Sequence, residues 1–299
     1  VLDKNLDKFF KWFHERGTPK LIVSEKYVGK NYKVTFRQEK PVKSGKYSNK
    51  VMPITYKILS SKGHFLQQKK TLVLDKKTSS IELKNQNEKP VISVLNSFSA
   101  PVLVEFKQPI DDLFSILEFE TDFTSIWMAK KKLDYLALEK IACSQTDVEN
   151  VISRTCETLV KKLDTPSLLA KLLELPSDYE YFSKLLETGI PDPQAIQINL
   201  RKYETLYKMC LEEFSLSYFK NFIHRKLYFR KNSDYQKRIL ASALIFLNKD
   251  TNFLNDFIDI IFNDSNNMTL KVSCLITYIV KKDEEENVNK FYLKYGKDK

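Results

Sequence analysis

The chain has 299 residues, 42% hydrophobic and 29% charged, which is the composition of a folded globular protein rather than a disordered one. At roughly 150 residues per domain, this length predicts about two domains. No apolar run approaches the ~20 residues of a membrane-spanning helix, so we expect no membrane contact. Glycine is scarce, at 6 residues, and no glycine-rich phosphate-binding motif occurs, which excludes the common nucleotide-binding loops.

The positive charge is concentrated in the first third of the chain. The formal net charge is +11, yet residues 1–110 carry +13 and residues 111–299 carry −2. The basic residues are 42 Lys and 7 Arg. Arg forms the bidentate hydrogen bonds that recognise phosphates and bases, whereas Lys carries a strongly hydrated point charge. A lysine-coated surface therefore explains the charge, and we expect no nucleic-acid partner. Nucleic-acid binding stays open as an alternative, and it would require affinity that falls steeply with salt.

The cysteines predict a reducing compartment. Cys143, Cys156, Cys210 and Cys274 all follow residue 140 without paired spacing, which argues against a disulfide scaffold and a zinc cluster. We therefore expect a cytoplasmic protein. Cys210 lies in a run with Met209 and Leu211 and is expected to be a core cysteine.

Hydrophobic residues alternate with polar ones up to about residue 107, as Tyr32, Val34 and Phe36 do. Short β-rich runs occur at residues 20–24, 32–36, 53–59, 71–74, 79–83, 90–95 and 101–106, with a turn at 60–63. Seven short strands with turn residues between them predict an immunoglobulin-like antiparallel β-sandwich over residues 19–108. No cysteine lies in this segment, so we expect packing alone to hold the two sheets together.

After Pro109 the hydrophobic residues recur with a period of about 3.6 residues, which is typical of amphipathic helices. Helical stretches are predicted at residues 111–120, 125–142, 146–163, 193–212, 234–248, 251–263, 268–281 and 283–295. Many helices joined by short links favour stacked pairs over a four-helix bundle. We therefore expect an all-α superhelical (ARM/HEAT-like) solenoid over residues 109–299, although no fixed-period repeat occurs.

Three helix starts carry their own signals. Thr146 with Glu149, and Ser177 with Glu180, have the spacing of a capping box. Asp192 followed by proline predicts an N-cap and a first helical residue.

The chain contains no recognisable catalytic motif. Neither H-E-x-x-H nor G-x-S-x-G occurs, and His14, His64 and His224 have no partner at metal-binding spacing. We therefore predict no catalytic residue, no cofactor-binding residue and no metal ligand in this chain.

A series of short phrases resembles the part of bacterial aminopeptidase N that follows its catalytic domain. They are, in order, Phe10-Lys11-Trp12-Phe13, Gly17-Thr18-Pro19, Tyr32 with Gln38 and Pro41, Met52-Pro53-Ile54, Phe98-Ser99-Ala100-Pro101-Val102, Leu175-Pro176-Ser177-Asp178-Tyr179-Glu180, Pro191-Asp192-Pro193 and Asn266-Asn267-Met268-Thr269.

The resemblance implies the β-sandwich and part of the helical domain of a gluzincin zinc aminopeptidase. Such an enzyme holds zinc with two His and a Glu, and a further Glu activates the metal-bound water. None of those residues has a counterpart here, so the resemblance places the zinc in a catalytic domain outside this chain. Residues 1–18 would be the linker helix leading out of that domain. The missing initiator methionine before Val1 fits this expectation of a fragment.

Two functions follow as hypotheses. In the first, the chain is a non-catalytic portion of an enzyme that removes N-terminal amino acids from peptides, and is inactive alone. Its sandwich is then a spacer, its helical domain caps the active site, and its partners are the catalytic domain and the parent's peptide substrates. In the second, it is a free-standing adaptor whose helical groove binds a peptide or partner. We also expect an incomplete solenoid to expose an apolar end and to self-associate.

Overall fold

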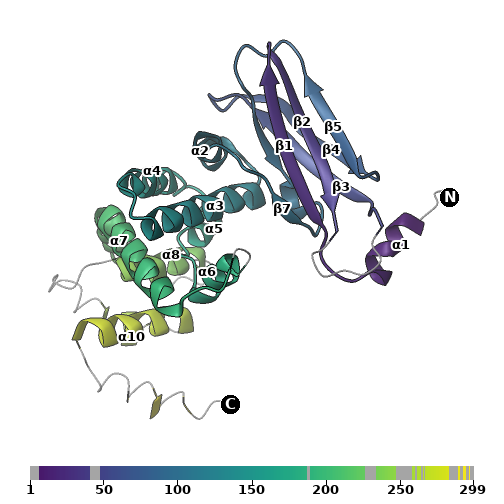
Figure 1. Cartoon of the computed structure of the whole chain (residues 1–299). Helices are drawn as coiled ribbons and strands as arrows, with labels where there is room; N and C mark the ends of the chain where they lie inside the picture. The colour runs from purple at the N-terminus through teal and green to yellow at the C-terminus, as the bar shows by residue number, and fades with distance from the viewer. Residues whose placement is uncertain are drawn as a thin grey trace, which may run out of the picture. The chain divides into compact units, whose positions relative to one another are not determined.

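The computed structural model describes residues 7–40, 48–186, 189–225, 234–246 and 267–282, together with short stretches between 258 and 265 and between 289 and 296. The chain divides into two compact units, residues 1–132 and 133–299. The seven strands lie in the first unit and most of the helices in the second, in the order shown in Figure 1.

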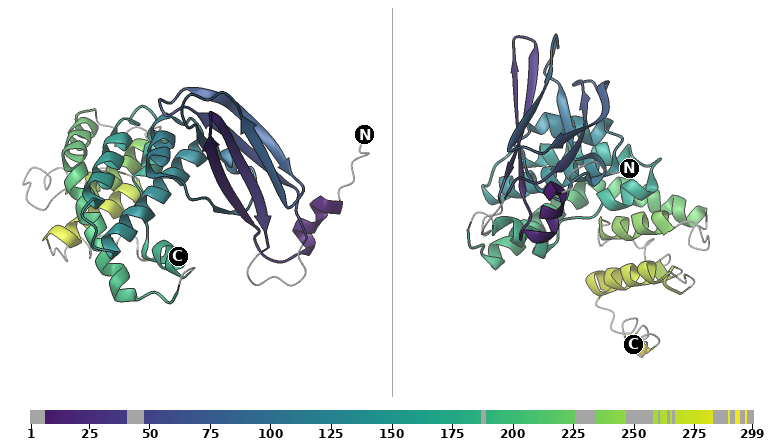
Figure 2. Two further views of the ribbon diagram at one scale, coloured as in Figure 1. Left: turned by 45° about the horizontal axis from the view of Figure 1, so that its top comes forward. Right: turned by 90° about the vertical axis from the view of Figure 1, so that its right-hand side faces the viewer.

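The N-terminal unit contains seven strands in two sheets. They are β1 (Lys20–Val28), β2 (Asn31–Glu39), β3 (Met52–Leu59), β4 (Phe65–Leu74), β5 (Thr78–Leu83), β6 (Val91–Val94) and β7 (Leu103–Glu105). One sheet has the order β5-β2-β1-β7 and the other the order β4-β3-β6. Figure 2 shows both sheets from two further directions. The predicted sandwich of seven strands is confirmed.

The period-two pattern produces the core of this sandwich. Tyr32, Val34 and Phe36 on β2 are each fully buried, and the polar residues between them face outward. Ile54 and Ile58 on β3 lie in the same cluster from the opposite sheet. The core is therefore the interface between the two inner faces, as in other sandwiches.

The strand pairing differs from the expectation in one place. Strand β1 pairs antiparallel with β2 but parallel with β7, with Lys20 opposite Leu103. The remaining pairs within the described residues are antiparallel. Alternation along a strand reports which face is buried and contains no information about the direction of its neighbour. The mixed sheet therefore could not be read from the pattern.

The two helices that follow the sandwich in sequence begin in the same compact unit. They are α2 (Ile110–Phe119) and the first part of α3 (Phe123–Ala142), within which the division between units falls. Lys57 on β3 donates to Glu120 Oε1 at 2.6 Å, and both side chains are almost completely buried. Asn96, beyond β6, donates to Ser125 Oγ at 2.6 Å. Buried polar contacts thus attach the start of the helical region to the sandwich.

The turn after β6 adopts a rare backbone conformation. Leu95, Ser97 and Phe98 have φ values of 57°, 57° and 51°, in the left-handed region that non-glycine residues seldom occupy. Ser99 Oγ accepts a hydrogen bond from the Thr55 amide of β3 at 3.0 Å. The F-S-A-P-V phrase therefore begins in a strained turn that is fixed to a core strand.

The turn between β3 and β4 lies against α2. Gly63 has a φ of +83°, and its amide donates to the Ser60 carbonyl at 3.0 Å, as the predicted turn requires. A Cβ at Gly63 would lie only 2.3 Å from the Phe119 ring. Glycine is therefore needed here for both conformation and space.

The second unit is helical throughout its described part. After the shared α3 it contains α4 (Val148–Val160), α5 (Pro166–Leu172), α6 (Asp178–Leu185), α7 (Pro193–His224), α8 (Asp234–Phe246) and α10 (Met268–Lys282). Neighbours in sequence pack against each other, as α6 with α7, α7 with α8, and α8 with α10 do. The predicted helix at 193–212 is too short, because α7 continues to His224. The stretches predicted at 251–263 and 283–295 lie mostly outside the described residues.

The helix starts agree with the sequence in two cases of three. Ser177 and Glu180 form a complete capping box at α6. Pro193 opens α7, and Asp192 accepts the Gln194 amide at 2.9 Å. The prediction of a capping box at Thr146 is wrong. Helix α4 starts at Val148 with Asp147 as its N-cap residue, and the Asp147 carboxylate accepts a hydrogen bond from Lys140 and caps no backbone amide.

A buried polar triad joins α3 to α7. Asp134 accepts hydrogen bonds from the hydroxyls of Tyr203 at 2.6 Å and Tyr207 at 3.3 Å. All three side chains are at most 1% exposed. Burial, and then the Asp134 charge, raise the pKa of both tyrosines well above the ordinary value, so both remain protonated donors.

The last helices share a separate apolar cluster. It consists of Phe219, Phe222, Leu240, Ile258, Ile261, Phe262, Leu270 and Cys274. No helix in the described part of the chain is both long and apolar enough to cross a bilayer.

Candidate functional site

The described residues contain no cluster of His, Cys, Asp and Glu suited to a metal ion. His14 ends the first helix, α1 (Asp7–His14), His64 precedes β4 and His224 ends α7, and all three are exposed. None of the three belongs to a group of possible metal ligands within the described residues. Two other places remain as candidates: a helix at the start of the chain and a pocket in the helical unit.

Helix α1 (Asp7–His14) is fastened to the sandwich at its C-terminal end. Trp12 Nε1 donates to the Val51 carbonyl at 3.0 Å, and the Trp12 ring packs against the sandwich core. Lys50, only 1% exposed, binds Glu15 at 2.8 Å and also donates to a carbonyl of α1. Figure 1 shows α1 at one end of the strands. The helix is thus held in place by a partly buried ion pair and by the hydrogen-bonded Trp12 indole.

The outer side of α1 is aromatic and exposed. Phe9, Phe10 and Phe13 are 48%, 49% and 73% exposed. The Phe9 ring makes edge-on contacts with the other two, at centroid distances of 6.2 and 6.0 Å. We call these three residues the α1 aromatic face. A fixed helix that presents three aromatic rings to solvent has the character of an interface.

The attachment of α1 is expected to weaken in acid. Burial raises the pKa of Glu15, but hydrogen bonds from Lys50 and Ser48 outweigh it and bring the pKa from 4.5 to about 2. Because this pKa is depressed in the folded state, the stabilisation is present above pH 4.5 and is lost as pH falls toward 2. In a Trp127→Phe background, Trp12 fluorescence should shift to the red over that range. Glu15→Gln should show the red-shifted spectrum at pH 6 already, and an acid shift unchanged by Glu15→Gln would contradict this reading.

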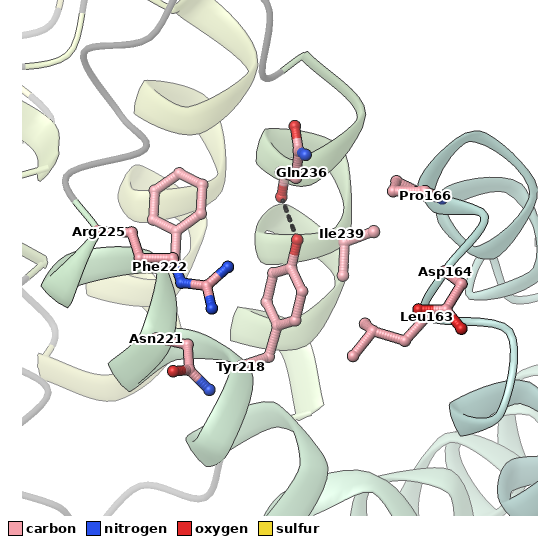
Figure 3. Close-up of a pocket in the computed structure, with 9 residues that line it drawn as sticks. All are labelled: Leu163, Asp164, Pro166, Tyr218, Asn221, Phe222, Arg225, Gln236 and Ile239. Atoms are coloured by element: carbon pink, nitrogen blue, oxygen red, sulfur yellow. Dashed lines mark hydrogen bonds between the residues drawn. The ribbon is translucent and has the colours of Figure 1, made fainter.

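A pocket of about 380 Å³ lies in the helical unit between the end of α7, the start of α8 and the link from α4 to α5 (Figure 3). Its apolar lining residues are Leu163, Pro166, Phe222 and Ile239. Tyr218 extends across it and donates to the Gln236 carbonyl at 3.3 Å. Burial raises the pKa of Tyr218, which keeps the hydroxyl protonated.

One acidic and one basic side chain lie at the edge of this pocket. Figure 3 shows Asp164 on the α4–α5 link and Arg225 on the opposite side, next to the end of α7. An apolar pocket of this volume with a few polar groups can take a small ligand or one or two residues of a peptide. Sequence reasoning missed it, because its residues come from segments more than 50 positions apart and match no motif.

The cysteines differ from the expectation at one position. Cys156 and Cys274 are buried, but Cys210 and Cys143 are exposed. The prediction of Cys210 as a core residue is therefore wrong. It lies on α7, a long helix whose apolar residues follow several contact faces, so an apolar neighbourhood in sequence does not indicate burial.

Both parts of the chain match known family models. Residues 17–107 match a domain of unknown function, DUF3458, with an Ig-like fold. Residues 110–299, more than half of the chain, match its companion DUF3458_C, described as ARM repeats. The chain belongs to this family. The predicted order of an immunoglobulin-like sandwich followed by an ARM-like helical domain is thereby confirmed.

The curated relatives are bacterial aminopeptidases N. The chain is 22% identical to the aminopeptidase N of Haemophilus influenzae over 296 residues and 26% identical to that of Escherichia coli over 301 residues. Each alignment covers 91% of this chain but 33% of the relative. The chain thus spans about a third of the length of these relatives, and its resemblance to the C-terminal half of aminopeptidase N is confirmed.

The fold also occurs in a solved structure. A crystal structure of Legionella pneumophila aminopeptidase A in complex with aspartic acid superposes with a TM-score of 0.77, covering 99% of this chain and 36% of that one. The sequence identity is 21%, so this likeness concerns the fold alone.

Proposed function

We propose that this chain is the non-catalytic C-terminal portion of a zinc-dependent aminopeptidase that removes N-terminal amino acids from peptides. The supporting observation is the coverage, since nearly all of this chain aligns with only a third of each curated aminopeptidase N. The motif that would bind zinc does not occur in its sequence. Zinc and the catalytic residues would then belong to another part of the enzyme. The cytoplasm is the proposed location, on the cysteine pattern.

In this proposal the sandwich is a spacer and the helical unit limits access to the active site. A rigid spacer needs a firm attachment to the next element, and the buried Lys57–Glu120 contact supplies one within residues 1–132. An ARM-like array of helices has an extended surface that can cover an opening and admit peptides while excluding folded proteins.

The α1 aromatic face is the proposed contact with the catalytic portion. Three exposed Phe rings on an anchored helix provide the apolar centre of an interface. The +13 charge of residues 1–110 would add electrostatic attraction to an acidic partner surface.

The first test of the proposal is the reading frame upstream of Val1. We expect it to encode H-E-x-x-H. The chain alone should hold no stoichiometric zinc and should not hydrolyse an alanyl p-nitroanilide. The chain joined to the upstream sequence should bind zinc and hydrolyse this substrate. Zinc and activity in the chain alone, or a start codon directly before Val1 with no metal motif upstream, would refute the proposal.

The interface is tested by binding to the separately expressed upstream polypeptide. The double variant Phe9→Asp, Phe13→Asp should weaken binding by at least about 10-fold, because each removes an exposed aromatic anchor. The double variant Val28→Asp, Val73→Asp, at apolar residues of the sandwich that are 60% and 56% exposed, serves as the matched control and should leave binding unchanged. Raising the salt should weaken binding further if charge contributes. Equal effects of both substitutions would contradict the assignment of the face.

The pocket between α7 and α8 supports the second candidate, a free-standing adaptor that binds a peptide. The sequence upstream of Val1 distinguishes the two proposals, since an adaptor needs no metal-binding motif there. Peptide binding that is lost in Arg225→Ala but persists in Phe13→Asp, in a chain whose gene starts at Val1, would favour the adaptor.

A further inference from the structure

The pocket of the helical unit combines a buried apolar wall with exposed polar edges (Figure 3). Phe222 and Ile239 are 1% and 0% exposed and form its inner wall, whereas Leu163 is 43% exposed. The hydrogen bond from Tyr218 to the Gln236 carbonyl holds the tyrosine ring in place. Its volume of about 380 Å³ lies near the lower end of the range for ligand-binding pockets, roughly 300–1,000 Å³. The pocket therefore suits a ligand smaller than a drug-sized molecule.

Helix α7 places two hydrogen-bond donors at one edge of the pocket. Tyr218, Asn221 and Arg225 follow one another at intervals of three and four residues, so they lie on one side of the helix. Asn221 and Arg225 are exposed, and neither side chain has a hydrogen-bond or ion-pair partner among the residues that the structure describes. A guanidinium next to an amide is an arrangement that can bind a carboxylate, which arginine holds through two parallel hydrogen bonds.

An acidic side chain lies at the other edge. Asp164, on the link from α4 to α5, is exposed and also lacks a side-chain partner within the described part of the chain. Figure 3 shows Tyr218 between Asp164 and Arg225, so the two charges lie on opposite sides of the pocket. A free α-amino acid carries its ammonium and carboxylate on one carbon, whereas a dipeptide separates them by about 7 Å. Charges on opposite sides match the dipeptide.

We propose that this pocket binds a dipeptide with two free ends and an apolar side chain. The peptide carboxylate accepts hydrogen bonds from Arg225 and Asn221, and the peptide ammonium donates to Asp164. The apolar side chain packs against Phe222 and Ile239. Each group of the ligand thus meets a group of complementary character, and the two free ends fix the direction in which the peptide lies.

This inference goes beyond the proposed aminopeptidase function, because binding is expected of this chain alone and requires neither zinc nor the upstream polypeptide. An upstream sequence without a metal-binding motif would remove the aminopeptidase proposal and leave the dipeptide site in place. A chain that binds no dipeptide would remove the site and leave the aminopeptidase proposal in place. The two failures are therefore distinguishable.

The test is calorimetric titration of the full chain with leucyl-leucine. We expect one site with a Kd of about 0.1–1 mM, as is usual for a ligand of this size. Acetyl-leucyl-leucine lacks the ammonium and leucyl-leucinamide lacks the carboxylate, so each should bind at least about 10-fold more weakly. Glycyl-glycine and free leucine should also bind at least about 10-fold more weakly. Equal affinity for the free and the blocked dipeptides, or no saturable binding of leucyl-leucine, would overturn the proposal.

Two variants assign the ends of the ligand. Arg225→Ala should weaken leucyl-leucine by about 10-fold and leave leucyl-leucinamide unchanged, because variant and ligand lack the same interaction. Asp164→Asn should weaken leucyl-leucine likewise and leave acetyl-leucyl-leucine unchanged. Both side chains are exposed, so circular dichroism at 222 nm should match the wild type.

The matched control is Arg201→Ala, at an exposed arginine of α7 that does not line the pocket, and it should leave all affinities unchanged. Equal weakening by Arg201→Ala and Arg225→Ala would show a general charge effect and contradict the site. The same would follow if Arg225→Ala weakened the amide as strongly as the free carboxylate.

Discussion

Lys57→Ala should lower the free energy of unfolding of the N-terminal unit by about 3–5 kcal/mol. Lys57 Nζ lies 2.6 Å from Glu120 Oε1 and 2.8 Å from Thr121 Oγ1, and the Glu120 side chain is fully buried. Without its partner, the Glu120 carboxylate would remain desolvated with only local donors. Urea unfolding followed by tryptophan fluorescence is a selective measurement, because Trp12 and Trp127, the two tryptophans of the chain, both lie in residues 1–132.

Two controls separate the buried charge from charge in general. Lys33 pairs with Glu82 at 2.9 Å with both side chains about half exposed, so Lys33→Ala should lower the free energy of unfolding far less than Lys57→Ala does. The double replacement Lys57→Met, Glu120→Leu should recover most of the loss, because it removes the unpaired charge and fills the volume. Equal losses at Lys33 and Lys57 would show that the junction is not held by this pair.

Asp134→Ala should destabilise the helical unit by about 2–5 kcal/mol, because two buried hydroxyls lose their acceptor at about 1–3 kcal/mol each. Tyr203 and Tyr207 are both about 1% exposed, with ring centroids 4.8 Å apart, so water cannot easily replace the carboxylate. Unfolding followed by circular dichroism at 222 nm should report the loss. The tryptophan transition of residues 1–132 should change much less.

A double-mutant cycle identifies the cause. In a Tyr203→Phe, Tyr207→Phe background, Asp134→Ala should cost clearly less than in wild type, since no hydroxyl is left without a partner. Ser153→Ala, which removes an exposed hydrogen bond to Glu157, should cost under about 0.5 kcal/mol. An undiminished cost in the Phe background would mean that Asp134 acts through other contacts.

The functional candidates were less accessible to sequence reasoning than the fold. The phrase Phe10-Lys11-Trp12-Phe13 indicated the family, but only the structure separates Trp12, which anchors α1, from Phe13, which is exposed. Both are aromatic and adjacent in sequence, and their roles depend on which side of α1 meets the sandwich. Cys210 was placed wrongly for the same reason, because its exposure depends on which side of α7 meets the other helices.

The sequence by itself determined the local features of this protein. Alternation at Tyr32, Val34 and Phe36 determined a half-buried strand, and the box at Ser177 determined a helix start, because both depend on residues within a few positions of each other. Tertiary structure alone decided what depends on distant partners: the parallel pairing of β1 with β7, the Lys57–Glu120 junction and the Asp134 triad. Periodicity records which face a segment buries, whereas a partner is chosen by packing across the folded chain.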